Sequence, residues 1–375
     1  MISLSGILQL FLLPVKLLWC MIKYPIFGGI EGIYKNNLRN SLKLTLFQSG
    51  MKFSVEDSAY LTAKSTQDVI DKLKPKYPKS TNLQNYGCKF DKQSIWLVEA
   101  EDRDKANPII IYCHGGGYFM NTAPDQIESM LSIYHLLEDR VRKRTSILVL
   151  DYSLACHGHY IGTQLYELAA TYKKLTTEGN DNLILFGDSA GGHLVITFLQ
   201  YLKQEQDVKL PWPRSTILIS PSNPANILIS PGNLPYRKSD WKDIPTFNNK
   251  NFSTFVLLGE HETMRDEILE WAKYALNSPL KKQPDSKGVL DLKLHEYRSG
   301  GVDEAYVEVI VEPWGIHDAV LFFEIDLIKT LEKNPRLSLD KLSDTKYFGM
   351  VRVTKFLGKD CTGRVKVQEE DKLDQ

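Results

Sequence analysis

Short apolar runs alternate with longer mixed stretches between about residues 109 and 311. The runs hold four to six residues each, a length typical of buried strands. They predict six strands, over residues 109–113, 147–151, 183–186, 216–219, 254–258 and 306–311. Because most of the runs are apolar at every position, we expect a largely parallel sheet that helices cover on both faces.

The stretches between these runs predict helices, over residues 126–142, 164–176, 191–204 and 265–276. A weaker strand is expected over residues 95–98. Alternation of strand and helix over about two hundred residues indicates an α/β sheet. Ligands of such sheets bind at the carboxyl ends of the strands, so the residues that directly follow each apolar run are candidates for a functional site.

The N-terminus carries a different pattern. Residues 2–22 are mostly apolar, and a helix of about twenty residues that rises roughly 1.5 Å per residue would cross a bilayer core of about 30 Å. We therefore expect membrane association through residues 2–22. Gln9, Pro14 and Lys16 interrupt the run, so a helix that lies in the membrane interface, or one that packs on the protein itself, is the alternative.

Composition narrows the choice of partners and cofactors. Lys plus Arg and Asp plus Glu each number 46, so the formal net charge is zero and no overall field favours nucleic acid as a partner. The five cysteines are scattered, without a CxxC pair or a histidine at metal-ligand spacing beside them. We therefore expect neither a bound metal nor a dense set of disulfides, and function must come from a local site.

The strongest chemical motif is the sequence Gly-Asp-Ser-Ala-Gly at residues 187–191, between a predicted strand and a predicted helix. A sharp turn from strand to helix strains the backbone at the serine and leaves little room for side chains at the flanking glycines. The helix that starts here also points its free N–H groups at charge that develops near Ser189. This context predicts that Ser189 is a nucleophile.

A second glycine-rich motif, His114-Gly115-Gly116-Gly117, follows the first predicted strand of the alternating region. Successive glycines let backbone N–H groups approach a ligand closely. Together with the N–H of Ala190 they would form an oxyanion hole, in which one donor is worth roughly 3 to 4 kcal/mol in the transition state. A flexible surface loop is the alternative, but the loop and the elbow occupy the two places that acyl transfer requires.

A general base is expected on a loop after the last predicted strand. His317 stands there, in a Trp-Gly-Ile-His-Asp sequence, and no other histidine has this position. The acid that orients it should follow the strand at 254–258, where residues 259–267 carry four carboxylates. Glu262 is the first choice and Asp266 the second.

These motifs together resemble the hormone-sensitive-lipase-like branch of the α/β-hydrolases, over roughly residues 107–322. The resemblance rests on HGGG, on GDSAGG, on DYSLA at residues 151–155 and on GEHETMRDE at residues 259–267. Within that branch the chain is most similar to fungal steryl acetyl hydrolases. The resemblance implies an α/β-hydrolase fold with a mostly parallel central sheet, helices on both faces and a helical cap.

The resemblance also implies residue roles. The branch's pattern for the catalytic acid, matched onto this sequence, assigns that role to Glu262. The second and third glycines of HGGG carry oxyanion donors in the branch, which implies Gly116 and Gly117 here, beside Ala190. The sequence departs from the pattern in two places, because the acid is Glu where Asp is usual and the motif DYRLAPE continues here as DYSLACH.

The implied function is that of a serine carboxylic ester hydrolase without a metal or organic cofactor. Likeness to the fungal enzymes implies a lipophilic ester, a steryl acetate, as substrate and the endoplasmic reticulum membrane as location. An esterase or lipase that acts on short-chain, other lipid or xenobiotic esters is the alternative within the same chemistry. A small-molecule binding protein without catalysis is the alternative of another class, although plant receptors of that kind lack the histidine that stands here as His317.

The chain accordingly divides into four segments. Residues 1–23 are the membrane-associated apolar segment, 24–105 the cap and N-terminal edge, 106–358 the α/β-hydrolase catalytic core, and 359–375 a charged tail that is expected to fray. Residues 222–250 and 280–304 are rich in Pro, Gly and polar residues and are expected to form loops or insertions. Asn251 begins a glycosylation sequon, which matters only if the domain is lumenal.

Overall fold

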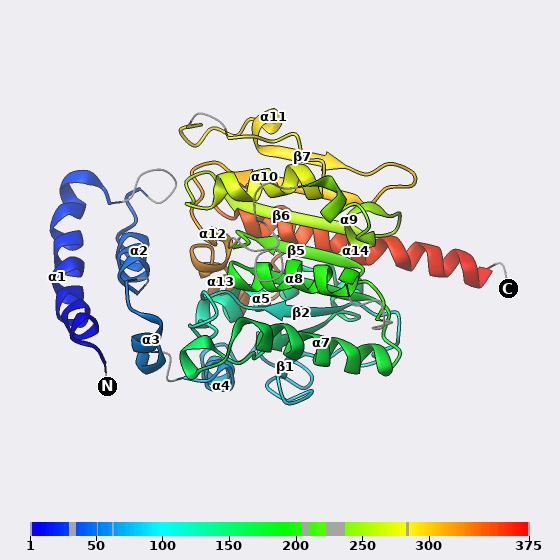
Figure 1. Cartoon of the computed structure of the whole chain (residues 1–375), viewed down its shortest axis with the longest axis horizontal. Coiled ribbons are helices and arrows are strands. Elements are labelled where there is room, and N and C mark those ends of the chain that lie inside the picture. Colours follow the sequence, from blue (N-terminus) through cyan, green and yellow to red (C-terminus); the bar gives the residue numbers. More distant parts are fainter. Residues whose placement is uncertain are drawn as a thin grey trace.

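A computed structural model of the chain contains one eight-stranded sheet in the order β1-β3-β2-β4-β5-β6-β8-β7. The structure describes residues 2–29, 35–50, 52–61, 64–204, 210–222, 237–282 and 285–373. The six inner strands run parallel to one another, and β1 and β7 pair antiparallel at the two edges. This mostly parallel sheet, with helices on both faces, is an α/β-hydrolase fold (Figure 1).

The seven predicted strands are confirmed, with boundaries that differ by at most two residues. The strands are β1 Ser94–Val98, β2 Ile109–Cys113, β3 Ser146–Leu150, β4 Leu183–Asp188, β5 Ser215–Ile219, β6 Ser253–Gly259, β7 Glu296–Ser299 and β8 Tyr306–Glu312. Strand β7 was not predicted and lies in a stretch expected to be loop. Its four residues are only partly buried, and it forms as an edge strand by pairing with β8.

Helices cover both faces of the sheet (Figure 1). One face carries α4 Thr66–Lys76, α5 Pro124–Leu136, α6 Asp139–Arg142, α12 Ala319–Phe322, α13 Asp326–Lys333 and α14 Phe348–Leu373. The other face carries α7 Ile161–Thr177, α8 Ala190–Gln204, α9 Pro245–Asn248 and α10 Arg265–Ala275, while the short α11 Leu292–His295 leads into β7. The single helix predicted over residues 126–142 is two helices, because the chain is extended at Leu137 (φ −62°, ψ 144°).

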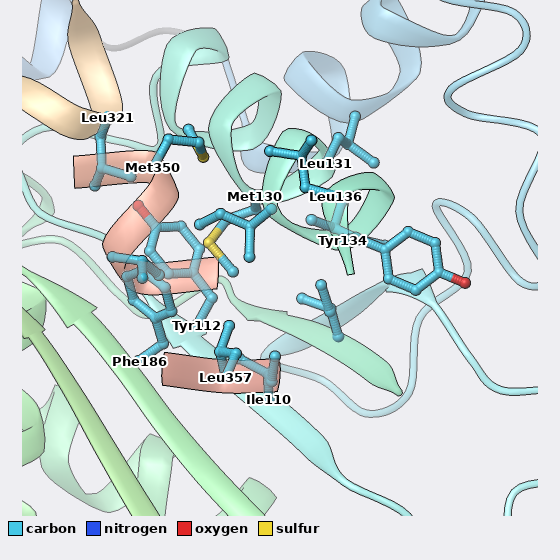
Figure 2. Packing of buried hydrophobic residues seen from close by; sticks show 14 of the residues in the cluster. Ile110, Tyr112, Met130, Leu131, Tyr134, Leu136, Phe186, Leu321, Met350 and Leu357 are labelled. Carbon is cyan, nitrogen blue, oxygen red and sulfur yellow. The ribbon is translucent and has the colours of Figure 1, made fainter. Parts of the chain in front are cut away.

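The inner strands bury side chains on both faces, as their apolar pattern predicts. Because side chains alternate along a strand, Tyr112 of β2 joins the core under α5, α12 and α14, whereas its neighbour Ile111 joins the core under α7 and α8. In the first core, Tyr112 and Phe186 meet edge to face with ring centroids 5.6 Å apart (Figure 2). Leu321 of α12 and Met350 of α14 belong to the same core. Because α12 begins just after residue 317, its packing in this core holds that part of the chain in place.

In the described part of the chain, three helices precede α4 and the sheet: α1 Leu4–Phe27, α2 Leu38–Gly50 and α3 Val55–Leu61. Helix α1 lies beside α2 at the edge of the molecule, away from the sheet (Figure 1). The N–H and the hydroxyl of Ser3 each donate to the carboxylate of Asp57 at 2.6 Å. Among the described helices, α1 alone is long and apolar enough to cross a membrane. Helix α2 packs on α12, where the rings of Phe47 and Phe322 lie 4.5 Å apart.

The C-terminal segment differs from the expected frayed tail, because α14 continues without a break to Leu373. The boundary predicted between residues 358 and 359 therefore falls inside a helix. Phe356 and Leu357 bury this helix against the sheet. Charge alone does not end a helix here, because the Lys, Glu and Gln residues of the segment are good helix formers.

The predicted loop at residues 222–250 lies in part outside the described residues, which resume at residue 237. The described part forms a short 3-10 turn, Lys238–Asp240, and α9. Asn251 stands in an exposed turn before β6, with φ 71°.

Candidate active site

Ser189 stands at the sharp turn between β4 and α8. Its φ is 47°, in the left-handed region that residues other than glycine seldom adopt. A Cβ at Gly191 would lie 1.9 Å from the carbonyl oxygen of Cys113, and a Cβ at Gly187 would lie 2.4 Å from the backbone of Gly191. Both glycines are therefore required by space, because β2, β4 and α8 meet at this turn.

The glycine-rich loop after β2 lies against the elbow. The N–H of Gly115 donates to Oδ1 of Asp188 at 2.9 Å and is therefore already bonded. Gly116 and Gly117 have φ values of 111° and 61°, a region that favours glycine. Within the described ranges, no group accepts a hydrogen bond from the N–H of Gly116, Gly117 or Ala190. The prediction that these three amides donate to an oxyanion is compatible with their free N–H groups.

Asp188, next to the nucleophile, fastens this loop to the sheet. Its buried carboxyl group accepts hydrogen bonds from Tyr112 Oη at 2.6 Å and from Gln126 Nε2 at 2.8 Å. Burial raises the pKa of Asp188 to about 6, and the hydrogen bonds from Tyr112, Gln126 and Gly115 act in the opposite direction. The side chain thus joins β2, α5 and the glycine-rich loop at one point.

The loop after β8 brings His317 to Ser189. Nε2 of His317 lies 2.9 Å from Oγ of Ser189, and Nδ1 lies 3.5 Å from Oε1 of Glu262. The imidazole is 38% exposed, whereas the side chain of Glu262 is completely buried. The three residues predicted for catalysis thus form a chain of contacts through the imidazole, in the order that a nucleophile, a general base and an orienting acid require.

Two hydrogen bonds hold the Glu262 carboxylate in place. Oε2 accepts from the hydroxyl of Ser220 at 2.6 Å and from the N–H of Gly259 at 2.8 Å, which leaves Oε1 for His317. Asp266, the second choice for the acid, lies on the first turn of α10, and its carboxylate binds Lys282 at 2.7 Å. Its carboxylate therefore pairs with a surface cation and not with the imidazole.

Three acids surround His317. Burial of the ring opposes its protonation, but the charges of Asp318, Glu262 and Asp188 together raise the pKa of His317 to about 9. The imidazolium is therefore strongly stabilised at this position. A base that holds its proton firmly is free to accept one from Ser189 only when the pH is high enough to deprotonate it.

Two further histidines support the glycine-rich loop. Nδ1 of His114 lies 2.7 Å from the carbonyl oxygen of Gly115, and the ring stacks on Tyr152 with centroids 4.1 Å apart. Burial lowers the pKa of His114 to about 4, so this ring is neutral at pH 7. Nδ1 of His193 lies 2.6 Å from Oη of Tyr118, which follows the last glycine of the loop.

One group among the described side chains has the spacing of a metal site, Glu260 with His261 and Asp285. The Glu260 carboxylate accepts hydrogen bonds from the N–H and hydroxyl of Ser286 and from the N–H of Trp314, at 2.6 to 2.8 Å. Its oxygens are thus already used to hold the chain around Ser286 against the loop that carries His317. These hydrogen bonds explain why Glu260 lies where it does, so its place in the group needs no bound metal ion.

Three polar neighbours of the triad were not found from the sequence. The hydroxyl of Ser222 lies 3.1 Å from that of Ser189, and the hydroxyl of Ser220 accepts from the N–H of Asp318 at 3.1 Å. Ser220 and Ser222 directly follow β5, so the rule that functional residues follow parallel strands would have found them. Asp318 carried no such signal, because its role depends on how the loop after β8 turns.

The sequence profile of the steryl acetyl hydrolase family matches residues 34–231, which is more than half of the chain. This range contains the glycine-rich loop and Ser189, while Glu262 and His317 lie beyond it.

Two fungal relatives are similar in sequence. A Schizosaccharomyces pombe protein assigned as a steryl acetyl hydrolase, mug81, is 28% identical over 323 residues, which cover 72% of this chain and 84% of that protein. Steryl acetyl hydrolase 1 of Saccharomyces cerevisiae is 26% identical over 120 residues, which cover 31% of this chain and 26% of that protein.

Solved structures of similar architecture include an esterase/lipase from an uncultured bacterium, with a TM-score of 0.46 and 20% identity over 72% of this chain and 81% of that one. Another is a bacterial esterase of the hormone-sensitive lipase family, with a TM-score of 0.43 and 18% identity over 82% of this chain and 95% of that one. The profile match, together with the motifs on which it rests, shows that the chain belongs to the steryl acetyl hydrolase family, a family of carboxylic ester hydrolases.

Proposed function

We propose that this protein removes the acetyl group from steryl acetates by a mechanism in which Ser189, His317 and Glu262 act as nucleophile, base and acid. The observation that carries the proposal is the 2.9 Å contact between Ser189 Oγ and His317 Nε2 at the elbow. Family membership supports the class of substrate. The amides of Gly116, Gly117 and Ala190, for which the described residues offer no acceptor, support an acyl-transfer reaction.

In the first half of the reaction, Ser189 Oγ attacks the carbonyl carbon of the acetate ester while His317 Nε2 takes the hydroxyl proton. The carbonyl oxygen becomes an oxyanion, to which Gly116, Gly117 and Ala190 donate hydrogen bonds. When the tetrahedral intermediate collapses, the bond to the sterol oxygen breaks and that oxygen receives the proton from Nε2. The products of this half are the free sterol and an acetyl group on Ser189.

In the second half, His317 takes a proton from water, and the water oxygen attacks the acetyl carbonyl carbon. The same amides stabilise the second oxyanion, and its collapse returns the proton to Ser189 Oγ and releases acetic acid. Glu262 accepts the hydrogen bond from Nδ1–H, which fixes the proton of the resting imidazole on Nδ1 and stabilises the imidazolium. The long 3.5 Å contact between Glu262 and His317 is expected to shorten when the ring is charged.

Helix α1 supports a membrane location for this reaction. Its 24 residues span about 36 Å at 1.5 Å per residue, which exceeds a hydrocarbon core of about 30 Å. Leu8, Phe11, Val15 and Trp19 are each more than half exposed to solvent, an arrangement that is costly in water and favourable in lipid. Steryl acetates dissolve in membranes, so we propose that the enzyme works on the endoplasmic reticulum membrane with α1 inserted.

The membrane proposal is tested by deleting residues 2–27. The truncated protein is expected to leave the membrane pellet and to appear in the soluble fraction, while it still cleaves a short nitrophenyl ester. A variant that instead lacks the residues after Cys361 is the control and should stay in the pellet. A truncated protein that remains in the pellet after an alkaline carbonate wash would argue against α1 as the anchor.

The enzymatic proposal is tested on detergent-solubilised protein with a steryl acetate, a short nitrophenyl ester and a long-chain triacylglycerol. Acid release from the steryl acetate by the wild type, and its loss by several orders of magnitude in Ser189→Ala, supports both the nucleophile and the substrate class. Serine-dependent cleavage of the nitrophenyl ester alone would retain the esterase and remove the sterol. Absence of any release would favour a binding protein on the hydrolase fold.

The acid is tested with a matched pair of variants. Glu262→Gln removes the charge that faces Nδ1 of His317 and is expected to lower kcat by at least 100-fold. Asp266→Asn makes the same change four residues further on, at a carboxylate that binds Lys282, and should leave kcat within about twofold of the wild type. The reverse pattern would transfer the acid role to Asp266.

A further inference from the structure

A second acidic side chain, besides Glu262, touches the proposed base, and it does so on the side that faces the nucleophile. Oδ2 of Asp318 lies 3.3 Å from Nε2 of His317, the nitrogen that also contacts Ser189. Glu262 contacts the opposite nitrogen, Nδ1. The imidazole is therefore flanked by a carboxyl group at each of its two nitrogens, and a triad accounts for only one of them.

The backbone holds Asp318 in this position. Its φ is 54°, and its N–H donates to the hydroxyl of Ser220, which also binds Glu262. The side chain is 5% exposed, and Oδ1 has no hydrogen-bond partner among the described residues. Asp318 does not cap α12 with its side chain. Among the described residues, the one polar contact of this buried carboxyl group is thus with His317, and a structural role at the helix terminus does not explain it.

The groups around the pair come from three other elements. Glu262 follows β6, Asp188 ends β4, and Tyr112 of β2 bonds to Asp188. Burial raises the pKa of Asp318 well above its usual value, as do the charges of Asp188 and Glu262, while His317 acts in the opposite direction. Asp318 can therefore ionise in this setting only when His317 is protonated, because the positive imidazolium then balances the negative charge of the carboxylate.

We propose that Asp318 is a positioning residue that binds the imidazolium form of His317 at Nε2 and thereby sets the pH above which the esterase becomes active. This inference rests on the proposed role of His317 as the general base. When His317 holds the proton taken from Ser189, Asp318 accepts a hydrogen bond from Nε2–H beside the leaving group. In the resting enzyme the same contact stabilises the protonated imidazole, so His317 loses its Nε2 proton and becomes able to act as a base only at higher pH.

The test is the pH dependence of kcat/KM in Asp318→Asn. Asparagine tolerates a positive φ, so the loop is expected to keep its conformation. Removal of an opposite charge within about 4 Å shifts a pKa by roughly 1 to 3 units, so the acidic limb of the profile should move to lower pH by at least one unit. The control Asp340→Asn removes an equal charge from an exposed turn and should leave the limb unchanged. An acidic limb that stays in place in Asp318→Asn would refute the proposal.

A second measurement does not depend on turnover. In the Ser189→Ala background, the rate at which diethyl pyrocarbonate modifies His317, followed by peptide mass spectrometry, reports the neutral imidazole at each pH. The midpoint of this profile should fall by at least one unit when Asp318→Asn is added, and an unchanged midpoint would refute the proposal. If the wild type cleaves no ester and the midpoint still falls, the proposed function fails while the Asp318 contact holds. Should Asp318→Asn not fold, Asp318→Gly fits the same φ and repeats both measurements.

Discussion

The hydroxyl of Ser220 offers a sensitive test of how the acid is held. It donates to the buried Glu262 carboxylate at 2.6 Å and accepts from the N–H of Asp318 at 3.1 Å. Ser220→Ala removes both hydrogen bonds and keeps the Cβ, so the strained φ of 40° at this position is unchanged. The variant thus tests the effect of the hydroxyl alone, which connects Glu262 to the loop that carries His317.

The expected cost follows from the nature of the two bonds. A hydrogen bond to a charged group contributes about 1.5 to 3 kcal/mol, and a buried N–H left without an acceptor costs about 1 to 3 kcal/mol. We expect Ser220→Ala to lower the free energy of unfolding by about 3 kcal/mol. Glu262 keeps its bond from the N–H of Gly259, so the carboxylate is loosened but not released. We therefore expect kcat/KM to fall by about 10- to 100-fold, equivalent to roughly 1.4 to 2.7 kcal/mol.

Urea unfolding, together with initial rates on a nitrophenyl ester, measures both effects. Ser129→Ala is the matched control, because that buried hydroxyl donates to the carbonyl oxygen of Leu321 at 3.0 Å and touches no carboxylate. The control should lose about 1 kcal/mol of stability and keep its kcat/KM. If Ser220→Ala lost no more activity than Ser129→Ala, the claim that Ser220 positions Glu262 would be wrong.

Two other results are expected. Gly191→Ala should fail to give folded protein, or should melt far below the wild type by circular dichroism, because its Cβ would lie 1.9 Å from the carbonyl oxygen of Cys113. A normal melting temperature would mean that β2 and α8 do not approach each other this closely at the elbow. The kcat/KM of the wild type should rise about tenfold per pH unit up to about pH 9, because the acids around His317 raise its pKa to about 9 and only the neutral ring accepts a proton. A kcat/KM that has already reached its plateau at pH 7 would contradict this explanation.

Much of the fold follows from the sequence because the inner strands are apolar on both faces. That pattern leaves a parallel sheet between two layers of helices as the arrangement that buries all of them. Strand β7 was not predicted, because its residues are polar and partly exposed, and it forms only by pairing with β8, the next strand along the chain. The break between α5 and α6 was not predicted either, because no Pro or Gly at residue 137 marks the end of a helix in the sequence.

The candidate site was predictable to the extent that its residues stand at strand ends. Ser189 and His317 could be chosen from position and chemistry alone, whereas the choice of Glu262 over Asp266 also needed the family pattern; in the structure His317 contacts both Ser189 and Glu262. The residues that hold them were not predictable in this way. Asp318 meets Nε2 only because its own φ of 54° turns the side chain back toward the ring.

The central claim, that Ser189 is the nucleophile, is tested most directly by active-site labelling. A nitrophenyl alkylphosphonate forms a stable bond with an activated serine and releases nitrophenol, and peptide mass spectrometry then locates the adduct. We predict one adduct per chain, on Ser189, with none in Ser189→Ala. An adduct on Ser222, whose hydroxyl lies 3.1 Å away, or retention of labelling in Ser189→Ala would contradict the assignment.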